Sequence, residues 1–261
     1  MKRRDFVTAT AAFAAMGTAL KAESAPAPAR QYLELRKYQT LYGDNKGILD
    51  RFLAEAAIPA WNRQGIEPVG AFSVKYGESD PTVYVLLPHP SMESVVTSTR
   101  AMLEDDEFLK KGADFLDVSS SDANFFRMEN SLMLTFTGMP TLEIPEAVKG
   151  KDGRIFEMRI YESHSEKKAK KKIEMFNEGG EIEIFRKTGL YPVFFGEAII
   201  GPRLPNLTYM LGFESMEQRD ANWKTFVNSP EWKELSPKEE YKDTVCNISD
   251  IILSPKSYSQ I

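Results

Sequence analysis

The residues best suited to chemistry lie in two short segments that share one pattern. Residues 33–38 read Leu-Glu-Leu-Arg-Lys-Tyr and residues 156–161 read Phe-Glu-Met-Arg-Ile-Tyr, so each has an acid, an arginine and a tyrosine at alternate positions. In a β-strand, alternate residues point to the same face. Such a face could bind an anionic or quinone-like small molecule through bidentate arginine contacts. The candidate ligand-binding residues are Glu34, Arg36, Tyr38, Glu157, Arg159 and Tyr161.

The two faces of these strands differ, and this difference decides where the polar residues should lie. Leu33 and Leu35 alternate with the polar residues of the first segment, and we expect these leucines to pack against helices. The polar set would then project into a cavity between two sheets. In a structural alternative, the acid and the arginine of each segment pair across the domain interface and only fix its register.

Few other residues offer catalytic or metal-binding chemistry. His89 and His164 are the only histidines, and neither has the neighbouring ligands of a metal site, so we expect both to be exposed loop residues. The single cysteine, Cys246, has no histidine aligned to activate it and is predicted to be a buried small hydrophobe. The sequence therefore predicts no metal site and no cofactor, and it disfavours haem.

An internal repeat relates the two polar segments. Shifting the chain by about 124 residues aligns them and keeps further matches in order over roughly 80 positions. Gly-Ile-Glu-Pro-Val at 65–69 meets Gly-Leu-Tyr-Pro-Val at 189–193, and Ser-Met-Glu at 91–93 recurs at 215–217. The chain is therefore a tandem duplication of one unit.

Each copy is predicted to fold as strand, helix, strand, strand, helix and strand. Alternation, helical spacing of apolar residues and turn residues place the elements of the first copy at 32–38, 46–64, 69–76, 82–87, 92–103 and 125–136. The strands of the second copy are expected at 154–161, 193–201, 207–213 and 246–254. The predicted domains are residues 30–137 and 154–261, joined by a Pro- and Gly-containing linker at 138–153.

This element order predicts an α+β fold. The order βαββαβ is that of a ferredoxin-like unit, in which an antiparallel sheet carries both helices on one face. The other face of the sheet must be covered as well, so two tandem units should pack sheet to sheet as a pseudo-dimeric α+β barrel.

The repeated motifs resemble the NIPSNAP family. The resemblance rests on Glu-x-Arg-x-Tyr, Gly-x-x-Pro-Val and Ser-Met-Glu, and it covers about residues 31–136 and 154–258. It implies membership of the dimeric α+β barrel group, which includes antibiotic-biosynthesis monooxygenases, chlorite dismutases and dye-decolourising peroxidases. The family commonly has an arginine shortly after the acid of the second helix. Only Arg219 of the second copy can take that role, because Ser94 and Val95 stand there in the first copy.

The N-terminus is similar to a twin-arginine signal peptide. Lys-Arg-Arg-Asp-Phe-Val at 2–7 precedes an apolar stretch at 8–20, and an Ala/Pro segment completes residues 1–29. We therefore expect export by the twin-arginine machinery to the periplasm or the medium. An apolar stretch of this length is too short for a stable membrane anchor.

Composition and resemblance together restrict the function. The chain of 261 residues has a net charge of −5, which argues against a nucleic-acid partner. We expect an exported protein, a monomer or an assembly of pseudo-dimers, that binds or processes a small organic molecule between the two sheets. If it is an enzyme, the resemblance implies a cofactor-independent monooxygenase or isomerase. The alternative is a noncatalytic scaffold or interaction protein with a filled barrel.

Overall fold

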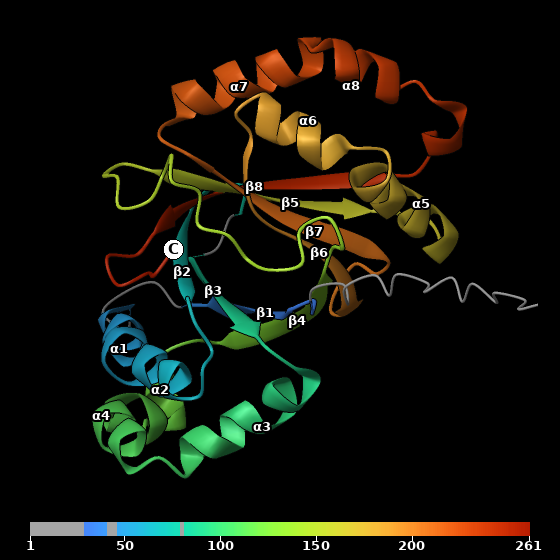
Figure 1. Cartoon of the computed structure of the whole chain (residues 1–261). Coiled ribbons are helices and arrows are strands. Elements are labelled where there is room, and N and C mark those ends of the chain that lie inside the picture. Colours follow the sequence, from blue (N-terminus) through green and yellow to red (C-terminus); the bar gives the residue numbers. More distant parts are fainter. Residues whose placement is uncertain (1–28, 41–45, 79–80) are drawn as a thin grey trace, which may run out of the picture.

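The computed structural model describes residues 29–40, 46–78 and 81–261 of the chain. Eight antiparallel strands form a closed barrel in the order β1-β3-β2-β8-β5-β7-β6-β4. Helices α1 to α4 lie on one side of this barrel and helices α5 to α8 on the other (Figure 1). The predicted fold class, two tandem ferredoxin-like units packed sheet to sheet as a pseudo-dimeric α+β barrel, is therefore confirmed. The predicted signal peptide lies outside the described residues, except for residue 29.

The strands and helices follow the same order in the two halves. The first half contains β1 (Tyr32–Gln39), α1 (Lys46–Arg51), a π-helix (Phe52–Ala57), α2 (Ile58–Arg63), β2 (Gly70–Tyr76), β3 (Thr82–His89), α3 (Met92–Leu103), α4 (Asp106–Leu116), a 3-10 turn (Ser120–Asp122) and β4 (Arg127–Thr135). The second half contains β5 (Ile155–Glu162), α5 (Glu166–Asn177), α6 (Glu181–Lys187), β6 (Tyr191–Ile200), β7 (Asn206–Phe213), α7 (Met216–Asn228), α8 (Pro230–Leu235), a 3-10 turn (Glu239–Tyr241) and β8 (Asn247–Pro255).

Two seams join the halves into one barrel. At one seam β2 pairs with β8, beginning at Phe72 and Pro255. At the other seam β4 pairs with β6, beginning at Leu132 and Ile200. Because every edge strand has a partner in the other half, the sheet has no free edge.

The repeated Ser-Met-Glu motif has the same structural role in both halves. Ser91 precedes α3 and its side chain accepts a hydrogen bond from the Ser94 amide, while Ser215 precedes α7 and accepts one from Gln218. A serine at this position satisfies an amide that the helix leaves unpaired. The duplication has thus kept the start of the second helix in each half.

Each half also contains a helix that the sequence analysis missed. Helix α4 begins after Asp105, whose carboxylate accepts a hydrogen bond from the Phe108 amide, and α8 begins after Ser229, which accepts one from Trp232. Phe108 is buried and Trp232 is partly buried. These additional helices extend the layer that covers each half of the barrel.

The apolar core has three parts. One part lies between the strands and helices of each half, and the third fills much of the barrel interior. Leu33, Leu35 and Phe156 belong to this interior part, together with Val148 from the inter-domain segment and the C-terminal Ile261. One end of the barrel is therefore closed by the chain itself.

Candidate functional site

The predicted polar residues lie on the opposite face from the one expected. Leu33 and Leu35 point into the barrel, whereas Tyr38 packs with the helix-facing core of the first half. The prediction that the polar set lines the space between the two sheets is therefore wrong. The physical reason is that the converging strands need apolar side chains in the barrel interior, while the polar groups find hydrogen-bond partners on the helix side.

Glu34 is the centre of the polar network in the first half. Arg36 donates from Nε to Glu34 Oε1 at 2.7 Å and from Nη2 to Oε2 at 3.2 Å, so the pair forms along one strand and not across the interface. Asn130 Nδ2 donates to Oε1 at 2.8 Å, and His89 Nε2 lies 3.1 Å from Oε2. Burial opposes ionisation, but the bond from His89 and the charge of Arg36 hold the pKa of Glu34 below its usual value.

His89 is a buried member of this network. The sequence analysis expected an exposed loop residue, but His89 ends β3 and its exposed fraction is 0%. Its Nδ1 lies 2.9 Å from Ser94 Oγ, and Nε2 faces Glu34. Both ring nitrogens are therefore occupied, which makes His89 a positioning residue for Glu34. His164 is exposed, as predicted.

Arg36 and Tyr38 line a pocket between the strands and helices of the first half. We call it the sheet–helix pocket; its volume is about 250 Å³, and its walls are Arg36, Tyr38, Phe52, Trp61, Thr99, Met102, Leu103, Phe108, Phe115, Leu116, Phe125 and Met128. Most of these side chains are apolar, so the few polar groups would set the orientation of a ligand.

The polar groups of the pocket are held in place by their neighbours. Glu34 fixes Arg36 from one side, and the guanidinium lies 5.1 Å from the centre of the Trp61 ring. Burial would lower the pKa of Arg36, but Tyr38 and Glu34 raise it, so the guanidinium stays charged. Trp61 Nε1 is buried and has no hydrogen-bond partner among the described residues. The pocket thus contains one guanidinium, which is paired with Glu34 and lies beside the Trp61 ring.

The second half holds the equivalent acid in a different network. Glu157 has an exposed fraction of 0% and accepts bonds from Arg219 Nη2 at 2.6 Å and Nε at 3.0 Å. Trp223 Nε1 also donates to Glu157, at 2.6 Å, whereas Arg159 Nη1 is 3.9 Å away. Burial, followed by the charge of Asp250, raises the pKa of Glu157 against the opposing effect of Arg219 and Trp223.

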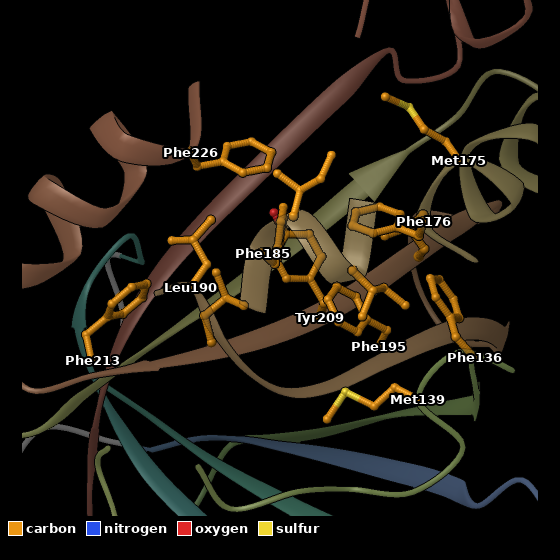
Figure 2. Close-up of a cluster of buried hydrophobic side chains, with 14 of the residues drawn as sticks. Phe136, Met139, Met175, Phe176, Phe185, Leu190, Phe195, Tyr209, Phe213 and Phe226 are labelled. Carbon is orange, nitrogen blue, oxygen red and sulfur yellow. The ribbon is translucent and has the colours of Figure 1, made fainter. Parts of the chain in front are cut away.

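Aromatic rings fill the corresponding space in the second half. Trp223 lies 5.8 Å from Phe185 and 4.6 Å from the Arg159 guanidinium, measured at the ring centres. Tyr209 donates a hydrogen bond to the Tyr161 hydroxyl at 2.9 Å. Figure 2 shows Phe185 and Tyr209 within this cluster. Arg159 and Tyr161 are therefore covered by packed rings.

The internal repeat explains the contrast between the halves. Position 99 of α3 corresponds to position 223 of α7, and threonine stands at the first where tryptophan stands at the second. The smaller side chain lines an open pocket, and the larger one packs over Arg159. Thr99 was missed by the sequence reasoning, although the alignment of the repeats contained the signal.

Other candidate residues are placed as follows. Cys246 is exposed, so the prediction of a buried cysteine is wrong; it lies just before β8, where its thiol meets the Glu162 carbonyl at 3.3 Å. Among the described residues, no group of three or more His, Cys, Asp and Glu side chains is arranged to hold a metal ion. None of the helices in the same part of the chain is long and apolar enough to span a membrane.

Comparison with known proteins follows the two halves of the chain. Residues 33–131 and 156–260 match the NIPSNAP family. An uncharacterized NIPSNAP-like domain protein from Burkholderia xenovorans is 25% identical over 41% of this chain and 88% of its own, with a TM-score of 0.37. No curated protein matches the chain.

Two solved structures are similar over most of the molecule. A candidate monooxygenase from Fusobacterium nucleatum has a TM-score of 0.53 at 9% identity, over 87% of this chain and 93% of its own. Another from Lactobacillus acidophilus has a TM-score of 0.54 at 12% identity, over 87% and 94%. At these identities the likeness shows a shared barrel fold. With both halves matched by the family, the chain belongs to the NIPSNAP family.

Proposed function

We propose that the first half of the protein binds a small, mostly apolar organic molecule in the sheet–helix pocket. The observation that carries this proposal is the open apolar pocket around Arg36 and Tyr38, at a position where the second half is filled by Trp223. A duplicated unit that needed only stability would be expected to fill both spaces, because an unfilled space forfeits packing energy.

The chemistry of the walls indicates the class of ligand. The aromatic and aliphatic side chains favour a flat or compact hydrocarbon body. Arg36 is charged and 9% exposed, and Glu34 occupies its Nε and Nη2, so a carboxylate, phenolate or quinone oxygen of the ligand would meet its remaining N–H groups in a site with little water. The ligand should therefore be an aromatic acid, phenol or quinone whose oxygen reaches Arg36.

The competing role, a noncatalytic scaffold with a filled barrel, is supported by one feature. Val148 and Ile261 are buried in the barrel interior and close one of its ends. This packing accounts for the interior at that end, but it does not extend to the sheet–helix pocket. The two roles consequently differ in what they predict for ligand binding at Arg36.

A fluorescence titration with 2-naphthoate tests the proposal. Thr99→Trp should fill the pocket as Trp223 fills the other half, and it should weaken binding by at least about tenfold, or 1.4 kcal/mol. Thr97→Trp is the matched control, because Thr97 is exposed on the same helix and does not line the pocket. 2-Methylnaphthalene, which lacks the carboxylate, should bind more weakly than 2-naphthoate. Equal affinity of wild type and Thr99→Trp for 2-naphthoate would refute the proposed site.

We also propose that the protein is exported by the twin-arginine route. Support comes from Arg3 and Arg4 and from the apolar stretch at 8–20 that follows them. The first strand of the barrel begins at Tyr32, so removal of residues 1–29 would leave every described element of the barrel intact. Export would place the ligand in the periplasm or the medium.

A further inference from the structure

A second cavity lies at the other end of the barrel, between the two halves. We call it the mouth cavity; its volume is about 300 Å³, and its walls are Leu35, Lys37, Glu78, Tyr84, Glu129, Ser131, Met158, Ile160, Pro202, Arg203, Asn206 and Thr208. Leu35, Met158 and Ile160 form an apolar wall. The remaining walls carry charged and polar groups from both halves, unlike the walls of the sheet–helix pocket.

One pair of opposite charges in the mouth cavity is already neutralised. Lys37 Nζ lies 2.8 Å from Glu78 Oε1, and the Tyr84 hydroxyl donates to the same oxygen at 2.7 Å. Burial raises the pKa of Tyr84, so this phenol stays protonated and remains a donor. This set therefore forms a fixed part of the wall and leaves the other charged groups to a ligand.

Arg203 is a cation without an anionic partner among the described residues. It lies in the turn between β6 and β7, and its Nη1 donates to Ser249 Oγ on β8 at 2.7 Å. This side-chain contact is to a hydroxyl and not to a carboxylate. The Arg203 side chain therefore extends from the turn between β6 and β7 toward β8 at the open end of the barrel.

The backbone of Arg203 is held in a costly conformation. Its φ of 62° lies in the left-handed region, which costs a residue other than glycine about 1–2 kcal/mol. Asn206 is buried, and its Nδ2 donates to the carbonyls of Pro202 at 3.1 Å and Arg203 at 3.2 Å. A strained residue that its surroundings hold in place points to a functional constraint.

Glu129 is the complementary group on the opposite half. It lies on β4 two residues before Ser131, so both side chains share the inner face of the barrel. Glu129 forms no ion pair within the described part of the chain. A Cβ placed on Gly201 would come within 2.8 Å of Ser131 Oγ, so the turn that carries Arg203 packs close to this strand. Charges on Arg203 and Glu129 both act on Tyr84, with opposite signs.

We propose that the mouth cavity binds a small zwitterion, whose carboxylate meets Arg203 and whose ammonium group meets Glu129. The apolar wall of Leu35, Met158 and Ile160 would hold the methylene groups between the two charges. A volume of about 300 Å³ corresponds to roughly ten waters and so admits a molecule of about ten non-hydrogen atoms. The matching class is the unbranched ω-amino acids and compounds of similar length and charge.

Isothermal titration calorimetry of the full mature chain tests this site with a series of probes. The series runs from glycine through β-alanine, 4-aminobutyrate and 5-aminopentanoate to 6-aminohexanoate, so that only the distance between the charges changes. At least one member should bind with a Kd below about 1 mM. Hexanoate and hexylamine, which keep one charge each, should bind at least about tenfold more weakly than the best zwitterion.

Substitutions locate the binding. Arg203→Gln and Glu129→Gln should each raise the Kd of the tightest-binding zwitterion by at least about tenfold. Arg186→Gln is the matched control, since Arg186 is exposed on α6 and pairs with Glu143 far from the cavity walls. Thr99→Trp should leave zwitterion binding unchanged, which separates this site from the sheet–helix pocket.

Three results would overturn the proposal. They are a Kd above about 1 mM for every member of the series, equal binding of the singly charged analogues, and unchanged affinity in both Arg203→Gln and Glu129→Gln. Each result would leave the proposed function of the sheet–helix pocket unaffected, because that function depends on Thr99 and Arg36.

Discussion

Thr99 and Trp223 occupy equivalent positions, and their difference in size decides which half has an open pocket. Trp223 packs against Phe185 and donates its ring N–H to Glu157, so it contributes both packing and a hydrogen bond. Thr99 makes neither of these contacts and borders the sheet–helix pocket. The two halves therefore share a fold, while only the first has an open sheet–helix pocket at this position among the described residues.

Exchanging the residues should have unequal effects on stability. Trp223→Thr should lower the free energy of unfolding by about 3–5 kcal/mol, because it creates a cavity and leaves Glu157 with one bond fewer. Thr99→Trp should change the same quantity by less than about 1.5 kcal/mol, since its ring enters an existing pocket. Urea unfolding at neutral pH measures both values. Equal losses in the two variants would contradict the assignment of one filled and one open half.

Glu34 should make stability depend on pH on the acid side. Its pKa is lower in the folded protein than the usual 4.5, so the folded state gains stability that is fully present above that value. This gain is lost as the pH falls through the lower folded pKa. Urea unfolding of Glu34→Gln should show a loss of about 3 kcal/mol at pH 7 that shrinks below pH 4.5.

A matched control separates this effect from general acid destabilisation. Glu183→Gln removes an exposed carboxylate on α6 and should leave the difference from wild type near zero at every pH. The explanation through Glu34 fails if the loss in Glu34→Gln is the same at pH 7 and at pH 3.5.

At the scale of strands and helices, alternation located the strands but not the direction of their faces. The segment from Leu33 to Tyr38 alternates between apolar and polar residues whichever of its faces meets the helices. The alternation alone therefore does not say which face that is. The barrel interior and the helix layer both take apolar side chains here, so Leu33 carried no decisive signal. Only the contacts of Glu34 with His89 and Asn130, both distant in the sequence, place the polar face on the helix side of the strand.

The additional helices α4 and α8 show a similar limit of prediction from the sequence. Helix α4 follows α3 after two residues, and its N-cap Asp105 is the local signal that separates them. Ser91 and Ser215 keep the same N-cap, which helped to make the internal repeat recognisable in the sequence. The repeat predicted the order of the strands correctly. The sequence alone did not predict the contacts between elements that are far apart in the chain.

At the scale of the whole molecule, the closed barrel couples the two halves. The seams between β2 and β8 and between β4 and β6 share backbone hydrogen bonds, and Phe72 packs against Phe156 with ring centres 5.1 Å apart. Unfolding one half would expose the interior face of the other. Scanning calorimetry should therefore show a single transition with equal calorimetric and van't Hoff enthalpies. Two separated transitions would contradict this coupling.

The proposed export by the twin-arginine route concerns the whole precursor. Replacing Arg3 and Arg4 together by lysine should leave the precursor in the cytoplasm, because the twin-arginine machinery reads the pair itself. Fractionation of cells followed by immunoblotting measures the distribution, with Lys21→Gln as the control outside the pair. Equal amounts of the double variant and the wild type in the periplasm would exclude this route.

Native mass spectrometry of the mature protein, purified from the cells that produce it, tests the central claim most directly. A small molecule bound in the sheet–helix pocket should add a stoichiometric mass to the wild-type protein and to Thr97→Trp. The same added mass should be absent from Thr99→Trp. A bare polypeptide mass in the wild type, or an added mass that persists in Thr99→Trp, would contradict a ligand at Arg36 and favour the filled scaffold.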